Sequence, residues 1–402
     1  MAQLHDQAYP HPLFQSEQIL TEAFGDYEEK GLQLEEVIGC GSAAQVYKGT
    51  LTTKDEKTQK ELVQPVAVKI LHPWFQRQIT NDLWLMDTIA RRLHSLPSET
   101  IRMVNLPRAV QNFGDNLRRQ TDLRLERDNL KQFRANFYGE QDDESDSKIL
   151  FPRPMDGWVT SKVLVETLVE DATPIADFLK DASELGLQTR KELAGPLLRA
   201  FLKMIFQDNF VHCDVHPGNV LIQTATEDEE DKVPTNLFST LFRKTEGEST
   251  ESGKKIRRNI VFLDAGIAAS LNDNDRRNLK DLFKAVILND GYEAGRLMVE
   301  RAKYERCSEK EGGVEAFASG VQAIVSEFHD RRKHGLTLGA VRVGSLLSRV
   351  LDLCREHGVE IDPAMASIVI STLVLEGLGR SLEPSLNLMD CAVPFVLGGG
   401  KV

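Results

Sequence analysis

The chain has 402 residues, of which 41% are hydrophobic and 27% charged, a composition typical of a globular protein with a sizeable core. The net charge is −12, and the densest basic run, residues 254–258, follows an acidic tract, so we expect no nucleic-acid partner. The five cysteines form no Cys-x-x-Cys pair, which argues against a structural zinc site or a disulfide framework and suits a reducing compartment.

Targeting and membrane signals are weak in this sequence. No run of eighteen apolar residues occurs, so we expect no transmembrane helix in this chain. The first residues, M-A-Q-L-H-D-Q, lack a basic region followed by an apolar one, which excludes a secretory signal, and no mitochondrial targeting segment is visible.

The N-terminal part contains a polar extension and then a candidate phosphate loop. Residues 1–32 form the extension, with a helix expected over 16–29. Next, Val37-Ile38 and Val46-Tyr47 are predicted to form two short strands joined by small residues in a G-x-G-x-x-A-x-V pattern. Small residues let backbone N–H groups approach phosphate oxygens, although glycine turns are common in ordinary hairpins. The candidate nucleotide-binding residues are Gly39, Gly41, Ser42, Ala43, Ala44 and Val46.

A lysine interrupts the next apolar segment, V-A-V-K-I at residues 66–70. A strand can place such a lysine on its solvent-facing side, and that is the ordinary interpretation. The order of a small-residue loop followed by V-A-V-K is nevertheless typical of kinases, whose lysine contacts the α- and β-phosphates. We therefore expect Lys69 to be catalytic, with Ala67 in the nucleotide site.

Two acidic residues lie in a long helix expected over about residues 112–137. A kinase needs one glutamate on a helix here to pair with the strand lysine. Asp122 and Glu126 are four residues apart and would share one helix face. We choose Glu126 as the partner of Lys69.

Strands are then expected around residues 149–151, 158–159 and 163–169. The last of them would lead into the hinge between two lobes, where backbone groups at Glu166 and Leu168 could bind an adenine edge. The expected adenine contact follows from the order of the predicted elements alone, because no sequence motif marks this segment.

The stretch from Phe210 to Ile222, F-V-H-C-D-V-H-P-G-N-V-L-I, has the layout of a kinase catalytic loop. In such a loop an Asp orients or deprotonates the attacking hydroxyl, and an Asn five positions later holds a metal ion. Asp214 and Asn219 have this spacing. A polar loop between a helix and a strand is the alternative interpretation of the stretch.

An acidic insertion over residues 224–258 is expected to be disordered. The core then resumes with an apolar strand that ends in L-D-A-G at residues 263–266, which matches the second metal-binding element of kinases. Asp264 is therefore the second expected metal ligand. The remainder of the chain has helical periodicity.

These elements together predict an α+β, bilobal protein-kinase-like fold. The smaller, β-rich N-lobe with additional helices would span residues 33–169, and the larger, mainly helical C-lobe residues 170–402. The order of loop, lysine, glutamate, Asp/Asn loop and final aspartate predicts phosphoryl transfer that depends on ATP and Mg²⁺.

With these residues identified, the chain resembles the UbiB family of atypical kinases, also called the aarF-domain-containing or ABC-one family. The resemblance is carried by V-A-V-K-I-L-H-P at residues 66–73, T-D-L-R-L-E-R-D-N-L at 121–130, H-C-D-V-H-P-G-N at 212–219, and L-D-A-G. The chain looks most similar to the branch found in eukaryotic mitochondria.

The resemblance implies a function and roles for these residues. It implies an ATPase or kinase that supports coenzyme Q (ubiquinone) biosynthesis in mitochondria, with quinone-biosynthesis enzymes and inner-membrane lipid as partners. By position, Lys69 would contact the phosphates and Glu126 would hold Lys69. Asp214 would be the base, and Asn219 and Asp264 would carry Mg²⁺.

The sequence departs from the family pattern at several positions. The Lys-x-Gly-Gln motif is not found, and Gly41 replaces the alanine before the loop serine. The family's Glu-x-Asp becomes Gln120-Thr121-Asp122, so of the two expected regulatory residues, Gln120 and Asp122, one is neutral. Asp-Phe-Gly becomes Asp264-Ala265-Gly266, which keeps the metal ligand.

These departures leave three alternatives open. The first is a catalytically weak nucleotide-binding scaffold in a lipid-biosynthetic assembly. The second is a small-molecule kinase of the aminoglycoside or choline type, which also uses an H-x-D-x-x-x-x-N loop. The third is a structural protein without a ligand.

Overall fold

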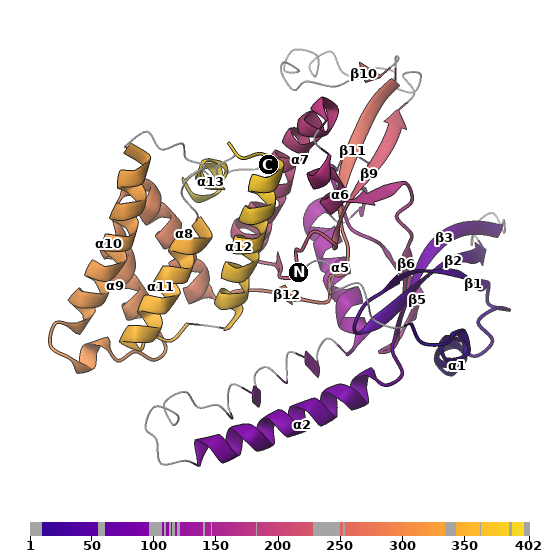
Figure 1. The fold of residues 1–402 in the computed structure, drawn as a ribbon, viewed down its shortest axis with the longest axis horizontal. Coiled ribbons are helices and arrows are strands. Elements are labelled where there is room, and N and C mark those ends of the chain that lie inside the picture. Colours follow the sequence, from indigo (N-terminus) through magenta and orange to yellow (C-terminus); the bar gives the residue numbers. More distant parts are fainter. Residues whose placement is uncertain are drawn as a thin grey trace. The chain divides into compact units, whose positions relative to one another are not determined.

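The computed structural model describes most of the chain, and two compact units divide it (Figure 1). The first unit comprises Met1–Ala135, Phe151–Val169 and Asp264–Gly266, and the second comprises Asn136–Leu150, Glu170–Leu263 and Ile267–Val402. The described residues are 10–54, 61–95, 107, 110–111, 114, 117–118, 121–139, 141–145, 147–181, 183–227, 250–251, 254–333, 343–361, 363–385 and 388–397.

The first unit is built on a five-stranded antiparallel sheet in the order β1-β2-β3-β6-β5. The strands are β1 (Leu32–Cys40), β2 (Ala44–Lys54), β3 (Glu61–Leu71), β5 (Pro154–Val159) and β6 (Val163–Thr167). The helices of this unit include α1 (Leu13–Phe24), α2 (Phe75–His94) and the start of α5 (Leu123–Tyr138).

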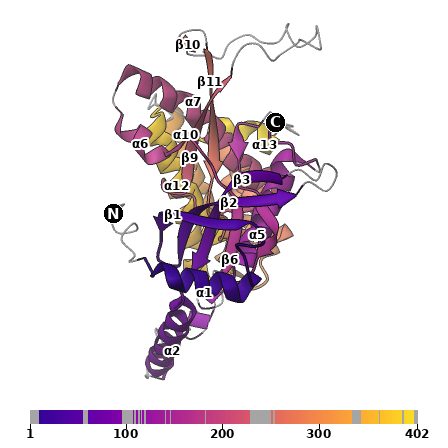
Figure 2. The ribbon, with the colours of Figure 1, turned by 90° about the vertical axis from the view of Figure 1, so that its right-hand side faces the viewer.

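Alternation along β3 gives this sheet two different faces. Val66, Val68 and Ile70 are fully buried and pack with residues of α1 in one hydrophobic cluster. Figure 2 shows α1 running beside β1, β2 and β3. Because successive side chains of a strand point to opposite faces, Ala67 and Lys69 lie on the other face.

Among the described residues, the second unit contains a five-stranded mixed sheet, a separate two-stranded sheet in which Ala268 pairs with His212, and a set of helices (Figure 1). The strands are β4 (Ile149–Leu150), β7 (Ala172–Pro174), β8 (Val211–His212), β9 (Val220–Glu227), β10 (Thr250–Glu251), β11 (Lys254–Phe262) and β12 (Ala268–Ala269). The helices are α6 (Ile175–Lys180), α7 (Glu184–Lys203), a π-helical turn (Met204–Asp208), α8 (Asp273–Leu288), α9 (Gly291–Arg301), a 3₁₀ turn (Cys307–Glu309), α10 (Gly313–Lys333), α11 (Val343–His357), α12 (Pro363–Leu382) and α13 (Leu388–Leu397).

The predicted fold class is confirmed, since an N-terminal β-rich unit is followed by a mainly helical remainder. The helix expected over residues 16–29 is α1, which ends at Phe24. Ile19 and Leu20 of α1 are buried in the cluster of the first unit, so this part of the N-terminal extension belongs to the core. Among the described residues, none of the helices has the length and apolarity to cross a membrane.

The ends of the insertion expected over residues 224–258 are ordered strands, which corrects the prediction of disorder there. Residues 224–227 belong to β9 and 254–258 to β11, and the two strands pair antiparallel from Val220↔Phe262 to Glu227↔Lys255. Ladder hydrogen bonds therefore extend this hairpin beyond the apolar segment that the sequence pattern marks. Residues 228–249 of the expected insertion lie outside the described residues.

Candidate functional site

A lysine on β3 and a glutamate on α5 form a buried ion pair in the first unit. Lys69 Nζ donates to both carboxylate oxygens of Glu126, each at 2.8 Å, and also lies 3.2 Å from Asp264 Oδ2. The Glu126 side chain is only 5% exposed. The structure therefore brings together three of the residues predicted from separate motifs, Lys69, Glu126 and Asp264.

Asp264 adopts an unusual backbone conformation, with φ of 50°. A non-glycine residue in the left-handed region costs on the order of 1 kcal/mol, and such residues cluster at functional sites. The carboxylate is held on one side by Lys69 and on the other by the Gly266 N–H, which donates to Oδ1 at 3.3 Å. The next residue, Ala265, is buried, and its carbonyl accepts a hydrogen bond from Asn129 Nδ2 on α5 at 2.7 Å.

A third carboxylate, that of Glu166 on β6, faces the same cluster. Strand pairing places Glu166 opposite Ala67 and Leu164 opposite Lys69, so Glu166 and Lys69 point to one face of the sheet. In the part of the chain that the structure describes, Glu166 Oε2 is buried without a hydrogen-bond partner. Val46 of β2, opposite Lys69, shares this face.

The electrostatics of the cluster follow from three carboxylates around one ammonium group. Burial alone would lower the pKa of Lys69, but Asp264 and Glu126 more than offset it and the pKa is raised, so Lys69 is charged. Burial raises the pKa of Glu126 to about 7, against the opposing effect of Lys69. Burial and the neighbouring Glu126 raise the pKa of Glu166 to about 8, so Glu166 holds a proton at neutral pH.

The hinge donors expected at Glu166 and Leu168 are used within the first unit. Leu168 N–H donates to Pro65 O at 3.3 Å, and Thr167 N–H donates to Arg153 O at 2.9 Å. The backbone of Glu166 pairs with β3 on one side and β5 on the other. The adenine contact at Glu166 and Leu168 stays a prediction, and the structure adds that the side chain of Glu166 lies on the sheet face of Lys69.

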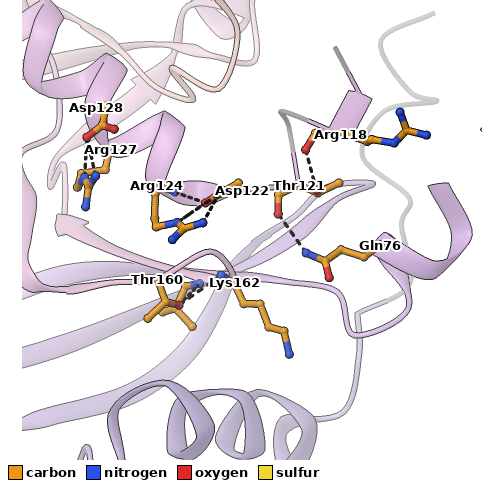
Figure 3. Close-up of polar contacts among 10 residues, drawn as sticks. Gln76, Arg118, Thr121, Asp122, Arg124, Arg127, Asp128, Thr160 and Lys162 are labelled. Carbon is orange, nitrogen blue, oxygen red and sulfur yellow. Dashed lines mark hydrogen bonds and ion pairs between the residues drawn. The ribbon is translucent and has the colours of Figure 1, made fainter. Parts of the chain in front are cut away.

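Asp122 caps α5 and does not share a face with Glu126, which corrects the prediction of one continuous helix through both residues. Its carboxylate accepts from Arg124 Nη2 at 2.6 Å and from the Arg124 backbone N–H at 3.0 Å (Figure 3). The hydrogen bonds from Arg124 lower the pKa of Asp122. An aspartate just before an apolar run is an N-terminal helix signal that sequence reasoning could have used. Gln120, the other expected regulatory residue, lies outside the described residues.

The small-residue loop joins β1 to β2. Gly39 lies at the end of β1, while Ala44 and Val46 lie in β2, so residues 41–43 alone form the connection. The Gly41 N–H donates to Ala44 O at 2.9 Å, and the His72 N–H donates to Ala43 O at 2.9 Å. Gly41 and Ser42 are exposed, which leaves them accessible to a ligand.

The predicted catalytic loop lies in the second unit between β8 and β9. Asn219 Nδ2 donates to the backbone oxygen of Asp214 at 3.1 Å and to its Oδ2 at 3.2 Å. Since both partners are acceptors, the amino group must point toward Asp214, and Oδ1 of Asn219 is the atom left to bind a cation. The expected Asp–Asn juxtaposition is therefore present.

His212 fixes the start of this loop. It is fully buried, and its Nε2 donates to Leu263 O at 3.0 Å while its Nδ1 accepts from the Asp214 N–H at 3.2 Å. Leu263 N–H in turn donates to Asn219 O at 2.8 Å. A neutral histidine thus connects the backbone of Asp214 to the residue that precedes Asp264 in the chain.

Two family models match this sequence. Residues 3–297 match the ABC1 atypical kinase-like domain, and residues 331–387 match the UbiB helical domain. A mitochondrial ABC1 family protein of Schizosaccharomyces pombe is 31% identical over 98% of this chain and 60% of its own length. A mitochondrial ABC1 family protein of Saccharomyces cerevisiae is 33% identical over 89% of this chain and 56% of its own.

Bacterial relatives are more distant. A protein of Pasteurella multocida named "Probable protein kinase UbiB" is 25% identical over 90% of this chain and 60% of its own length. The chain therefore spans about 60% of the length of these curated relatives. The names of the two yeast relatives confirm the expected mitochondrial branch. Because the first match covers more than half of the sequence, this chain belongs to the ABC1/UbiB family of atypical kinase-like proteins.

Proposed function

We propose that the protein binds ATP with Mg²⁺ and transfers the γ-phosphoryl group to an acceptor hydroxyl or to water. The observation that carries this proposal is the Lys69–Glu126 pair beside Asp264. In kinases the same pair must be in place for a strand lysine to contact the α- and β-phosphates.

The oxygen donors of the two units suit magnesium. Among the described residues, no three side chains of His, Cys, Asp or Glu gather into a metal-binding group. Mg²⁺ in nucleotide sites needs no such cage, because one or two protein oxygens, waters and substrate phosphates complete its shell. By their positions in the kinase motifs, Asp264 and Asn219 would each serve as a magnesium ligand, and the bound ion would neutralise charge on the phosphates.

Asp214 has the role of orienting the acceptor and receiving its proton. The acceptor oxygen forms a bond to the γ-phosphorus as the bond from that phosphorus to the β-phosphate oxygen breaks and ADP leaves. The hydroxyl proton passes to the Asp214 carboxylate. Asn219 Nδ2, which donates to Asp214 Oδ2, keeps the carboxylate in one orientation. Positioning and electrostatics provide most of the rate enhancement in this chemistry.

The remaining predicted residues would form the nucleotide site of the first unit. Residues 41–44 would approach the phosphates through backbone N–H groups, with Gly39 at the base of the loop. Val46 and Ala67 would line the apolar side of the base, because they share the sheet face of Lys69. The uncommitted Oε2 of Glu166 would accept a hydrogen bond from an amino group of the base.

The biological setting follows from the family. We infer that this protein supports coenzyme Q biosynthesis in mitochondria, with quinone-biosynthesis enzymes and inner-membrane lipid as partners. Support comes from the mitochondrial names of the two yeast relatives and from the UbiB helical domain match.

The test is ATP hydrolysis by purified protein with Mg²⁺, with and without liposomes and a phenolic quinone precursor. Asp214→Asn should lower turnover by at least about a hundredfold while ATP affinity stays within about threefold of wild type. The matched control is Asp208→Asn, which changes an acid near the same loop that pairs with Lys203 at 2.6 Å. Wild-type turnover in Asp214→Asn would contradict the assignment, and ATP binding without any turnover would favour the scaffold alternative.

A further inference from the structure

A buried chain of hydrogen bonds connects the N-terminal helix of the first unit to the small-residue loop. Five side chains form it, and each is at most 3% exposed: His11, Ser16, Gln45, Tyr47 and His72. They lie on the α1 face of the sheet, on the side opposite Lys69, since Tyr47 belongs to the cluster formed with α1.

The distances define the order of the five side chains along this chain of hydrogen bonds. Gln45 Nε2 lies 2.8 Å from Tyr47 Oη, Tyr47 Oη lies 2.8 Å from Ser16 Oγ, and Ser16 Oγ lies 2.7 Å from His11 Nε2. His11 Nδ1 then lies 2.8 Å from His72 Nδ1, and His72 Nε2 lies 3.0 Å from Gly41 O. The chain therefore ends on a backbone carbonyl of the candidate phosphate loop.

That carbonyl fixes the direction of every bond when both rings are neutral. A carbonyl can only accept, so His72 Nε2 carries the hydrogen and His72 Nδ1 is an acceptor. His11 Nδ1 must then donate, His11 Nε2 must accept from Ser16, and Ser16 must accept from Tyr47. Tyr47 in turn accepts from Gln45 Nε2.

The chain leaves no donor or acceptor of its rings and hydroxyls unmatched along this path. Gln45 Oε1 also accepts from the His11 backbone N–H at 2.9 Å, which closes a second connection. Burial, and then the adjacent ring of His72, lowers the pKa of His11 to about 4, which agrees with a neutral ring. Fully satisfied buried networks specify one geometry, because any displaced member leaves a costly unpaired group.

His72 holds the loop at two points. Its backbone N–H donates to Ala43 O, and its ring donates to Gly41 O. The ring is also stacked on Trp74, with centroids 5.0 Å apart and planes 4° apart. The loop conformation therefore depends on the orientation of one imidazole ring, and that orientation depends on His11.

We propose that His72 and His11 are positioning residues, through which the segment of residues 11–16 sets the geometry of the 41–44 loop and its affinity for nucleotide phosphates. The inference rests on the proposed nucleotide function of that loop. It assigns roles to residues that do not contact the phosphates themselves.

The first arm of the test measures amide hydrogen exchange in the loop. His72→Phe keeps a ring to stack on Trp74 but removes both ring hydrogen bonds, so exchange at Gly41 and at position 72 should rise at least about tenfold. His72→Gln places an amide N–H near the former Nε2, and should restore part of the protection. The control is Lys48→Ala. Lys48 lies on β2 beside Tyr47 and takes no part in the chain of hydrogen bonds, so this change should leave exchange unchanged.

The second arm measures binding of MgATP by the same variants. We expect the Kd to rise at least about fivefold in His72→Phe and His11→Phe, and less in His72→Gln. Nitrogen-15 spectra of the histidines should show hydrogen on Nε2 of His72 and on Nδ1 of His11.

The two arms separate failure of this inference from failure of the proposed function. If wild type binds no nucleotide, the proposed function fails while exchange and tautomers still test the positioning roles. If wild type binds MgATP but folded His72→Phe keeps loop exchange and Kd within about twofold of wild type, the inference alone fails. The opposite tautomer at His72 would also overturn it.

Discussion

Two buried polar networks lie on opposite faces of the sheet in the first unit, and their balance of donors and acceptors differs. On the α1 face, the hydrogen-bonded side chains from Gln45 to His72 include no carboxylate and no ammonium group, and each hydrogen bond joins a donor to an acceptor. On the other face, the carboxylates of Glu126 and Asp264 share one ammonium group, and the adjacent Glu166 Oε2 has no hydrogen-bond partner among the described residues.

The difference separates a complete network from an incomplete one. The hydrogen bonds of the network from Gln45 to His72 are all made within the protein, so the role of this network is to fix geometry. The Lys69 cluster has excess negative charge and an unpaired acceptor, features that are costly in a buried site unless a ligand completes it. A cation and a base with amino groups would complete it, which is what Mg²⁺ and ATP supply. The following changes test this comparison, from the largest expected effect to the smallest.

Removing the Lys69 ammonium group from the incomplete network should have the largest effect on the free energy of unfolding. Lys69→Met leaves Glu126 and Asp264 without their ammonium partner, and loss of one member of a buried pair costs about 3–5 kcal/mol. Denaturant unfolding would measure this loss. The control is Lys48→Met on β2, whose contact with Glu35 is 3.8 Å long and exposed, and which should cost less than about 1 kcal/mol. Equal losses in the two variants would contradict the comparison.

The two glutamates of the cluster should respond in opposite directions. Glu126→Gln weakens two charge-assisted hydrogen bonds to Lys69 and should lower the free energy of unfolding by about 2 kcal/mol. Glu166→Gln removes an excess carboxyl group and should leave stability unchanged or raise it. Destabilisation by Glu166→Gln as large as that by Glu126→Gln would show that Glu166 is already paired.

Glu166 should also affect the pH dependence of stability. Its pKa is raised from 4.5 to about 8, so the folded state keeps a proton that the unfolded state releases. Stability from this group is therefore full below about pH 4.5 and is lost as pH rises to about 8. Unfolding curves of Glu166→Gln between pH 5 and 8.5 should fall less steeply than those of wild type.

His11 should make the free energy of unfolding change with pH in the opposite direction, in the acid range. Its pKa is lowered from 6.5 to about 4, so between these pH values the unfolded state binds a proton on His11 and the folded state does not. Stability is full above about pH 6.5 and is lost as pH falls to about 4, by about 1–2 kcal/mol after allowance for solvent screening. His11→Asn, which can still donate a hydrogen bond, should flatten this part of the curve. An unchanged acid slope in that variant would indicate that His11 is charged in the folded protein.

A change in the loop itself should have the smallest effect on folding. A Cβ added at Gly41 would lie 3.8 Å from its nearest heavy atom, Ala44 O, which is ordinary van der Waals contact. Gly41→Ala should therefore change the free energy of unfolding by less than about 0.5 kcal/mol. If Gly41→Ala changes the free energy of ATP binding by more than this amount, as measured by titration, the change comes from the loop and not from misfolding. A large loss of stability would mean that Gly41 carries strain.

Sequence motifs led to three residues that the structure brings together in the first unit, Lys69, Glu126 and Asp264, whose roles toward a nucleotide stay predictions. Lys69, Asp214, Asn219 and Asp264 each lie in a segment with fixed spacing, and Glu126 followed from the need for a helix glutamate. The side-chain role of Glu166 depends on the register between β3 and β6, which no local pattern records. The pairing of His11 with His72 spans 61 residues and depends on the packing of α1, so it was likewise beyond sequence reasoning.

The errors at Asp122 and at the two ends of the expected insertion, residues 224–227 and 254–258, have local causes. Spacing alone predicts that Asp122 shares a helix face with Glu126, whereas the Asp122 carboxylate accepts a hydrogen bond from the Arg124 backbone N–H at the start of α5. The charged ends of the insertion suggested disorder, but ladder hydrogen bonds with the partner strand do not require apolar side chains.

The most direct test of the central claim is the thermal stability of wild type and Lys69→Met with ATP, in the presence and absence of Mg²⁺. If the cluster is a nucleotide site completed by a cation, MgATP should raise the Tm of wild type by several degrees, and ATP with a chelator should raise it much less. Lys69→Met should show no rise. An equal rise in Lys69→Met, or no rise in wild type at millimolar MgATP, would contradict the account.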